Sequence, residues 1–387
     1  MKILHIVPTY VPAWRYGGPI RSIHALCRAL AKKGHQVDVF TTNKNGAERL
    51  DIPVSEFINV NSVRVMYFEC NQWLDRIYYS RPMKKALQKE IENYDVIHLH
   101  SVYLWPTLMA ARICFRAKKP YLISPRGMLI GDLIRKKNSL IKKIYIYIFE
   151  SRNLKNASMV HCTSHLEELE LRNLKIGIPS VCVIGNGLLE ETEDEYGINN
   201  VHSFVPPPEN YLLFVGRLNW KKGLDRLIKA MPIIKDHILV IVGNDEDGYL
   251  AELKKICISQ NVQDRIHFYG EVVGVAKEKL IRGSSMLILP SYSENFGNVL
   301  LEAMAFGKAV GCTPEVGLAE VISKNNAGIV LPIDSKEMGK NLNTILGDKK
   351  SLLEMGQNGR ILFEREFDWS KLVIDFEKMY KKVLGVC

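Results

Sequence analysis

The sequence lacks the features that mark membrane-spanning, disulfide-stabilised and repeat proteins. No apolar run reaches the roughly 18 residues that a membrane span needs, and the apolar start Met1–Val7 is too short for a secretory signal. The eight cysteines include no C-x-x-C pair, which argues against a zinc site or a disulfide framework. Low-complexity tracts and internal repeats are also missing. We therefore expect a cytoplasmic protein with reduced thiols and no integral membrane segment.

Charge is unevenly distributed along the chain. The 387 residues carry a net charge of +10 and leave room for two domains of ordinary size. Residues 1–190 hold 28 Lys and Arg against 15 Asp and Glu, whereas residues 191–387 hold 24 against 27. A basic half suits nucleic acid, an anionic membrane surface or an acidic substrate. Because no nucleic-acid-binding module accompanies it, we expect no nucleic-acid partner.

Strand and helix patterns alternate in the first half. The predicted strands are Lys2–Val7, Gln36–Thr41, Asp95–Leu99, Pro120–Ile123, Ser158–Thr163 and Val181–Ile184. The predicted helices are Ser22–Lys33, Thr107–Ala117 and His165–Asn173. Such alternation predicts a parallel sheet with helices on both faces.

The same pattern restarts after a Pro- and acid-rich stretch, which we interpret as a linker over 191–210. The predicted strands are Tyr211–Val215, Ile238–Val242, Ile266–Tyr269 and Met286–Leu289, with helices over Gly223–Met231, Tyr249–Gln260 and Ser370–Leu384. We therefore predict an α/β protein of two doubly wound domains, 1–190 and 211–369.

The most informative motif places two acids, Glu294 and Glu302, eight residues apart. An apolar strand precedes it and a helix begins near Val299, so Glu294 lies in the strand-to-helix turn. Parallel sheets bind ligands at that carboxyl edge. Carboxylates suit sugar hydroxyls, and backbone N–H groups at a helix N-terminus suit phosphate. Two spaced glutamates alone are more often a solvated helix face.

A second motif, Phe214–Gly223, follows the predicted strand Tyr211–Val215. Gly216 allows a tight turn, and the cations Arg217 and Lys222 lie on either side of the following helix start. Arg can bind two phosphate oxygens at once, and Lys supplies a point charge. A surface basic loop is the alternative for this motif taken alone.

Together the two motifs resemble the retaining GT-B glycosyltransferases, specifically glycosyltransferase family 4 (group 1). The resemblance implies two Rossmann-like domains facing a central cleft, with the terminal helix 370–387 crossing back to the first domain. It also implies a nucleotide-sugar donor such as a UDP-, GDP- or ADP-sugar, and neither a cofactor nor a catalytic metal.

The family also implies roles for the motif residues. Arg217 and Lys222 would hold the diphosphate of the donor, and Glu302 its ribose. Glu294 would contact the transferred sugar as a catalytic residue. Backbone N–H groups near the helix start would bind phosphate, within the donor-binding residues Asn295, Phe296, Gly297, Asn298 and Val299.

Another loop, after the strand Ile238–Val242, contains Gly243 and is implied to lie near the nucleotide base. Its Asp245-Glu246-Asp247 string mimics the D-x-D metal motif of a different glycosyltransferase fold. Since the resemblance is to GT-B enzymes, we expect no metal there.

Between the first strand and first helix, Gly17 and Gly18 let the backbone approach a ligand closely. The family has a glycine pair here, near the donor phosphates and the acceptor. Arg21, just inside the helix, is a candidate for an anionic group of the acceptor, although a helix-surface arginine is an equal alternative.

The sequence departs from the family where some members carry a histidine after the strand Pro120–Ile123. Arg126 lies at about that place, and arginine cannot act as a base. We therefore expect Arg126 to be a catalytic and acceptor-binding residue that anchors phosphate or acceptor. This suits a front-face mechanism, in which the departing diphosphate takes the acceptor proton. Of His98 and His100, we expect one to face the core and His100 to be the catalytic and acceptor-binding candidate.

The acceptor is predicted to be a lipid-linked saccharide in the assembly of a bacterial surface polysaccharide such as capsule, exopolysaccharide or O-antigen. The basic, aromatic-rich segment 135–149 suits peripheral contact with an anionic membrane, or an ordinary packed helix. A small soluble acceptor is the main alternative.

An oxidoreductase is disfavoured because no G-x-G-x-x-G follows the first strand. An inactive relative of the family is disfavoured because the motif residues are intact.

Overall fold

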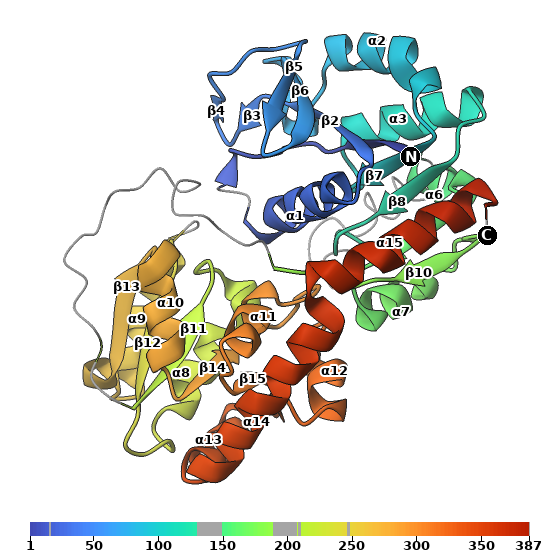
Figure 1. Ribbon diagram of the computed structural model, residues 1–387. Coiled ribbons are helices and arrows are strands. Elements are labelled where there is room, and N and C mark those ends of the chain that lie inside the picture. Colours follow the sequence, from blue (N-terminus) through green and yellow to red (C-terminus); the bar gives the residue numbers. More distant parts are fainter. Residues whose placement is uncertain (15–16, 130–148, 189–206, 208–209, 246–247, 387) are drawn as a thin grey trace. The chain divides into compact units, whose positions relative to one another are not determined.

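The computed structural model describes residues 1–14, 17–129, 149–188, 207, 210–245 and 248–386 (Figure 1). The chain divides into two compact units, Met1–Leu189 with Trp369–Cys387, and Glu190–Asp368. Nearly all of the predicted linker 191–210 and of the basic segment 135–149 falls outside the described residues.

The first unit is built on an eight-stranded sheet with the order β10-β9-β8-β7-β1-β2-β6-β5. All neighbours are parallel except β5, which runs antiparallel to β6. The strands are β1 (Lys2–Ile6), β2 (Gln36–Thr42), β5 (Phe57–Val60), β6 (Val63–Phe68), β7 (Val96–His100), β8 (Tyr121–Ser124), β9 (Met159–Cys162) and β10 (Val181–Val183). A separate hairpin pairs β3 (Lys44–Asn45) with β4 (Glu48–Arg49). The predicted parallel sheet is confirmed, but the sequence pattern did not reveal two of its strands, β6 and the antiparallel edge strand β5.

Helices pack on both faces of this sheet. They are α1 (Gly18–Lys32), α2 (Arg81–Glu90), α3 (Trp105–Arg116), α6 (Ser151–Asn156), α7 (His165–Asn173) and α15 (Trp369–Leu384). Side chains alternate along β1, so Ile3 joins the core on one face while Leu4 and Ile6 join the core on the other. The first helix begins at Gly18, four residues before the predicted start, because Pro19 is well suited to the first turn of a helix.

The second unit contains a fully parallel sheet of six strands, in the order β13-β12-β11-β14-β15-β16. The strands are β11 (Tyr211–Val215), β12 (Ile238–Val242), β13 (Ile266–Gly270), β14 (Met286–Leu289), β15 (Val310–Cys312) and β16 (Gly328–Val330). The helices are α8 (Leu224–Ala230), α9 (Tyr249–Ser259), α10 (Gly274–Gly283), α11 (Asn298–Ala305), α12 (Ala319–Lys324), α13 (Ser335–Leu346) and α14 (Lys349–Leu362). The doubly wound architecture is confirmed here too. In the described part of the chain, no helix combines the length and the apolar character that crossing a bilayer requires.

The C-terminal helix α15 returns to the first unit after the chain has completed the second. It packs beside α1 and against β7 (Figure 1). Leu372, Phe376 and Tyr380 are buried in the core that also contains Ile3 of β1. A hydrogen bond of 2.7 Å between His35 Nε2 and a carboxylate oxygen of Glu377 adds to this contact. The last helix is therefore an integral part of the first unit.

We expect Phe376→Ala to destabilise the first unit by about 3–5 kcal/mol, because the buried ring leaves a cavity when removed. The ring lies 5.1 Å from the His161 ring and 6.2 Å from that of Trp369. Ile374, on the same helix, is 39% exposed, so Ile374→Ala is the matched control. Thermal and urea unfolding would measure both variants. Equal stability of the two would contradict the packing of α15.

Candidate active site

The second unit has a topological switch point between β11 and β14. From β11 the chain continues outward to β12 and β13, whereas β14, on the other side of β11, leads outward to β15 and β16. Ligands of open parallel sheets bind at the carboxyl edge beside such a point. The loop after β11 carries Arg217 and Lys222, and the loop after β14 carries Glu294. The fold therefore brings the two sequence motifs to one edge of one sheet.

Close backbone contacts fix the loops at this edge. Gly223 has a φ of +65°, and a Cβ there would lie 2.0 Å from the Pro290 carbonyl oxygen. Gly243 has a φ of +151°, and a Cβ there would lie 1.9 Å from the Gly216 carbonyl oxygen. A side chain at either position would force the loops apart. Thus the loops after β11, β12 and β14 pack backbone against backbone, and only glycine allows this approach.

The Lys222 ammonium and the Glu294 carboxylate form an ion pair across the two loops. The two side chains are 19% and 21% exposed, so both remain accessible to a ligand. The Glu294 backbone is also held, because its N–H donates to the Glu315 carbonyl at 3.0 Å and its carbonyl accepts from the Gly317 N–H at 2.9 Å. The Glu294 carboxylate therefore projects from an anchored turn toward a fixed cation.

Glu302 lies on α11 and has a separate partner, since Lys277 Nζ of α10 is 2.8 Å from its Oε2. The side chain of Glu302 is 24% exposed. The two predicted acids thus occur in two separate ion pairs, one with Lys222 and one with Lys277.

Arg226 of α8 supports the turn that precedes Glu294. It is 9% exposed and lies 3.7 Å over the centre of the Tyr292 ring. Its guanidinium is also 3.7 Å from a carboxylate oxygen of Glu315, whose backbone pairs with Glu294. Burial, together with the hydrogen bond that Tyr292 donates to Asp225 at 2.9 Å, raises the pKa of the Tyr292 hydroxyl.

The sequence analysis missed Arg226 and Tyr292. A signal was present, because Arg226 lies among Leu224, Leu227 and Ile228 on the buried side of a short helix. A cation at such a position needs a partner for its charge, and the partners of Arg226 lie in the loops after β14 and β15.

The N-terminus of α11 lies at the same edge of the sheet. Gly297 precedes it with a φ of +101°, and within the described ranges no side chain caps it. Asn295, Asn298 and Val299 are half-buried around this terminus. Phe296, by contrast, is 4% exposed and packs edge-on against Phe367 at 6.0 Å. The ring of Phe296 therefore belongs to the core, and the side chain of this predicted donor-binding residue is not available to a ligand.

Arg217 is exposed directly after β11. The next residue, Leu218, donates its N–H to the Asn244 carbonyl at 2.8 Å, which links this loop to the one after β12. In that loop, Oδ1 of Asp245 accepts the N–H of Tyr249 at 2.8 Å, in the first turn of α9. Residues 246–247 of the D-x-D string lie outside the described residues. The carboxylate of Asp245 thus already holds a helix start.

In the first unit, the predicted glycine pair lies at the start of α1. Gly17 has a φ of +73° and Gly18 is the first helical residue. Within the described ranges, no side chain caps this helix N-terminus. Arg21 lies one turn further, with its guanidinium 5.3 Å from the centre of the Trp14 ring.

A chain of buried hydrogen bonds crosses the face of the first sheet that α15 covers. His161 Nε2 is 2.9 Å from the Ile184 carbonyl oxygen, so this nitrogen carries the proton and Nδ1 accepts from Ser124 Oγ at 2.7 Å. Ser124 Oγ then accepts from His98 Nε2 at 2.6 Å. His98 Nδ1 is left to accept the Tyr380 hydroxyl at 2.8 Å. The Ile184 carbonyl thus determines the tautomers of both His161 and His98, and this series of hydrogen bonds ends at Tyr380 of the C-terminal helix.

A second set of contacts joins His100 to Arg126. The guanidinium lies 3.3 Å from His100 Nδ1, and His100 Nε2 is 2.9 Å from His5 Nδ1. Arg126 has a φ of +56° and also donates to Asn186 Oδ1 at 2.9 Å. The structure thus brings the two predicted catalytic residues of this unit into contact, with His100 accepting a hydrogen bond from Arg126.

The expectation that one of His98 and His100 faces the core needs correction. Both are fully buried, and their rings are 4.1 Å apart on one face of the sheet. Residues two apart in a strand share a face, so the pair could not divide between core and site. Burial, reinforced by Arg126, lowers the pKa of His5 to about 3, and the pKa values of His98 and His100 are well below the usual range for the same reason.

Three of these histidines could be considered for a metal. Nitrogens of His5, His98 and His100 lie within 4.8 Å of one another, and no other such group occurs in the ranges that the structure describes. Both nitrogens of His98 are already hydrogen-bonded, however, and the Arg126 cation contacts His100. A metal cation bound there would be repelled by the positive charge of Arg126. The arrangement is therefore better suited to orienting Arg126 than to binding a metal.

Two family models together match most of the chain. The model of the family Glycosyltransferase Family 4 matches residues 16–191, and that of Glycosyl transferases group 1 matches residues 199–362. An uncharacterized glycosyltransferase of Methanocaldococcus jannaschii is 30% identical over 396 residues, which cover 98% of each chain. The O-antigen chain mannosyltransferase C of Escherichia coli is 24% identical over 99% of each chain.

Among solved structures, HepE of Anabaena, crystallised with UDP, matches with a TM-score of 0.69 at 18% identity. The match covers 99% of this chain and 100% of that one. At such identity the likeness concerns the fold, which is GT-B. The predicted fold class and the predicted family resemblance are both confirmed.

We expect stability to fall as the pH drops from about 6.5 toward 3, because four buried histidines stay neutral in the folded chain and bind protons when it unfolds. Their pKa values are lower in the folded chain than in the unfolded chain. The free energy of unfolding is therefore at its full value above the unfolded pKa of about 6.5, and it decreases as the pH falls below that pKa. Each contributes up to about 1.4 kcal/mol per pH unit.

Urea unfolding across this pH range would measure the slope. His5→Phe should make it shallower, whereas His165→Gln, at an exposed position, should not. A free energy of unfolding that is constant between about pH 6.5 and 5 would contradict the neutral network.

Proposed function

Because the chain belongs to glycosyltransferase family 4, the group 1 glycosyltransferases, we propose that it transfers a sugar from a nucleotide-sugar to a lipid-linked saccharide with retention of configuration. The observation that carries this proposal is the contact between Lys222 and Glu294 at the switch point of the second sheet. It brings a cation suited to a diphosphate to the carboxylate suited to a sugar. Arg217 and the start of α11 lie at the same edge.

The donor would bind at this edge through complementary charge. Arg217 and Lys222 would neutralise the diphosphate, and the open N-terminus of α11 would add backbone N–H groups. Glu302, held by Lys277, would accept hydrogen bonds from ribose hydroxyls. A diphosphate would compete with Glu294 for Lys222, so that donor binding frees the carboxylate for the sugar. HepE, which shares the fold, was solved with UDP.

The proposed retention of configuration is supported by the chemistry of Arg126 and His100, neither of which suits the role of a general base. Arg126 cannot accept a proton, and His100 Nδ1 already accepts a hydrogen bond from it. In the proposed step, the bond from the anomeric carbon to the diphosphate oxygen breaks as the acceptor oxygen bonds to the same face of that carbon. The acceptor hydroxyl proton passes to the departing diphosphate. Arg217 and Lys222 stabilise the negative charge on this leaving group, so no metal is required.

The proposed acceptor is a lipid-linked saccharide of a bacterial surface polysaccharide, used at the inner face of the cytoplasmic membrane. The likeness to an O-antigen chain mannosyltransferase along nearly the whole chain supports this assignment. So does the excess of cations in residues 1–190, which suits an anionic lipid diphosphate. Peripheral membrane contact through 135–149 stays a prediction. Equal transfer to free and to lipid-linked saccharides would favour the alternative of a small soluble acceptor.

We expect Glu294→Gln to lower kcat by about 100-fold or more, because the neutral amide loses the charge that stabilises the transition state. Release of nucleoside diphosphate in the presence of acceptor would measure this. Glu278→Gln, on the exposed side of α10, is the control and should keep its activity.

Chelation by EDTA should leave the turnover unchanged, and NMR of the product should show the anomeric configuration of the donor. Normal turnover of Glu294→Gln would exclude Glu294 from the mechanism, while inversion or an absolute need for metal would contradict the proposed step.

A further inference from the structure

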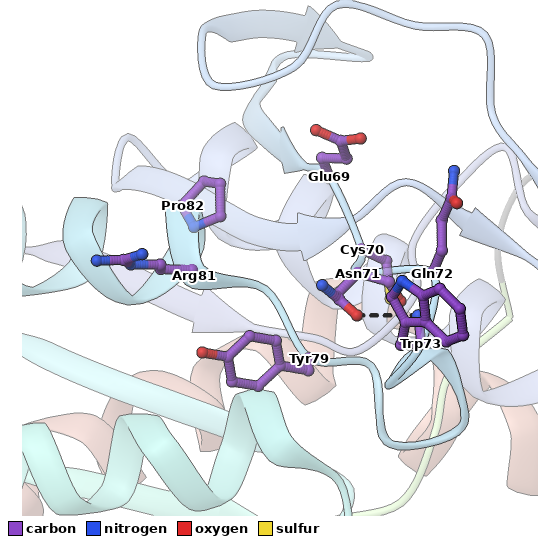
Figure 2. A pocket seen from close by; sticks show the side chains of 8 residues that line it. All are labelled: Glu69, Cys70, Asn71, Gln72, Trp73, Tyr79, Arg81 and Pro82. Atoms are coloured by element: carbon purple, nitrogen blue, oxygen red, sulfur yellow. Dashed lines mark hydrogen bonds between the residues drawn. The ribbon is translucent and has the colours of Figure 1, made fainter.

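The first unit has a second candidate site, a cavity of about 300 Å³ formed by the connection between β6 and α2 (Figure 2). Its lining residues are Glu69, Cys70, Asn71, Gln72, Trp73, Tyr79, Arg81 and Pro82. None of them belongs to the motifs that carry the proposed function. The volume is at the lower end of those that hold small molecules.

Trp73 is the most unusual residue of this cavity. Its side chain is 93% exposed, although burial of a tryptophan normally stabilises a folded protein. Figure 2 shows its ring at the edge of the cavity, with Arg81 and Pro82 on the opposite side. An exposed aromatic face offers an apolar platform on which the C–H face of a sugar ring can stack.

Hydrogen bonds within the loop hold it in place. Asn71 Oδ1 accepts the N–H groups of Trp73 and Leu74 at 2.9 and 3.1 Å, and the Asn71 N–H donates to the Tyr79 carbonyl at 2.8 Å. Asp75, further along the loop, forms a 2.7 Å ion pair with Lys44. A loop already ordered in this way loses little entropy when it binds a ligand.

The polar groups around the cavity suit hydroxyls. Glu69 supplies acceptor oxygens and Arg81 supplies donors, while Gln72 offers both kinds of group. The charges of Glu69 and Arg81 cancel, so the lining does not select a strongly charged ligand. An aromatic platform beside mixed donors and acceptors is the chemistry of saccharide recognition.

We propose that this cavity binds one sugar residue, stacked on Trp73 and hydrogen-bonded by Glu69 and Arg81. That the sugar belongs to the acceptor rests on the proposed function, whereas the binding itself does not. An anionic membrane surface is the competing occupant, because Leu74 and Ile77 are also exposed, at 46% and 41%. The carboxylate of Glu69 in the lining favours the saccharide.

Saturation-transfer NMR with methyl glycosides of glucose, galactose, mannose and N-acetylglucosamine would test this on the full chain. We expect at least one glycoside to bind, and Trp73→Ala to weaken that binding about tenfold or more. Glu69→Gln should weaken it as well. The matched control is Phe115→Ala, which removes another exposed aromatic ring of the same unit, outside the cavity. Because Trp73 is so exposed, its removal should leave the fold intact.

Three results would overturn the proposal. The first is that no glycoside binds, and the second is that Trp73→Ala binds glycosides as the wild type does. The third is that Trp73→Ala loses binding to phosphatidylglycerol vesicles and keeps its saccharide binding, which would assign the loop to a bilayer. UDP, GDP and ADP titrated into the same samples keep the two proposals apart. If the wild type binds a nucleotide and no saccharide, only the proposal for the cavity fails. If it binds a saccharide and no nucleotide, only the proposed donor site fails.

Discussion

The ion pair between Lys222 and Glu294 is the interaction on which the candidate donor site depends. As a partly exposed pair it adds on the order of 1 kcal/mol or less to stability, so its importance is positional. It joins the loops of two neighbouring strands, β11 and β14, at the point where the strand order reverses. Gly223 makes the contact possible by letting those loops touch. Arg226 then supports the turn from beneath, through Tyr292 and Glu315.

The first unit is organised by a different constraint, the need to satisfy polar groups in a dry interior. Unpaired, each buried histidine would cost several kcal/mol. The hydrogen-bonded chain from Ile184 to Tyr380 satisfies His161 and His98, and it ties the C-terminal helix to the sheet. Arg126 keeps its charge at neutral pH, because burial lowers its pKa only to about 10. The histidines packed against Arg126 therefore orient this cation while they stay neutral.

Local sequence patterns predicted much of this architecture. Hydrophobic periodicity located most of the strands in both sheets, and the two charged motifs located the loops at the switch point of the second unit. It did not reveal which side chains meet across the fold. No local pattern indicates that the Phe296 ring is buried while its neighbours are half-buried. The partners of Arg226 come from loops that follow other strands. The short strands β15 and β16 have only three residues each, too few for a clear period.

The central claim is that the carboxyl edge of the second sheet binds a nucleoside diphosphate through Arg217 and Lys222. The most direct measurement is calorimetric titration of UDP, GDP and ADP, without metal, into the wild type, Arg217→Ala and Lys350→Ala. Lys350 is 87% exposed on α14 and serves as the control. We predict that one nucleotide binds the wild type and Lys350→Ala alike, and that Arg217→Ala binds it about tenfold more weakly or worse. Unchanged affinity in Arg217→Ala, or no binding of any nucleotide to the wild type, would contradict the account.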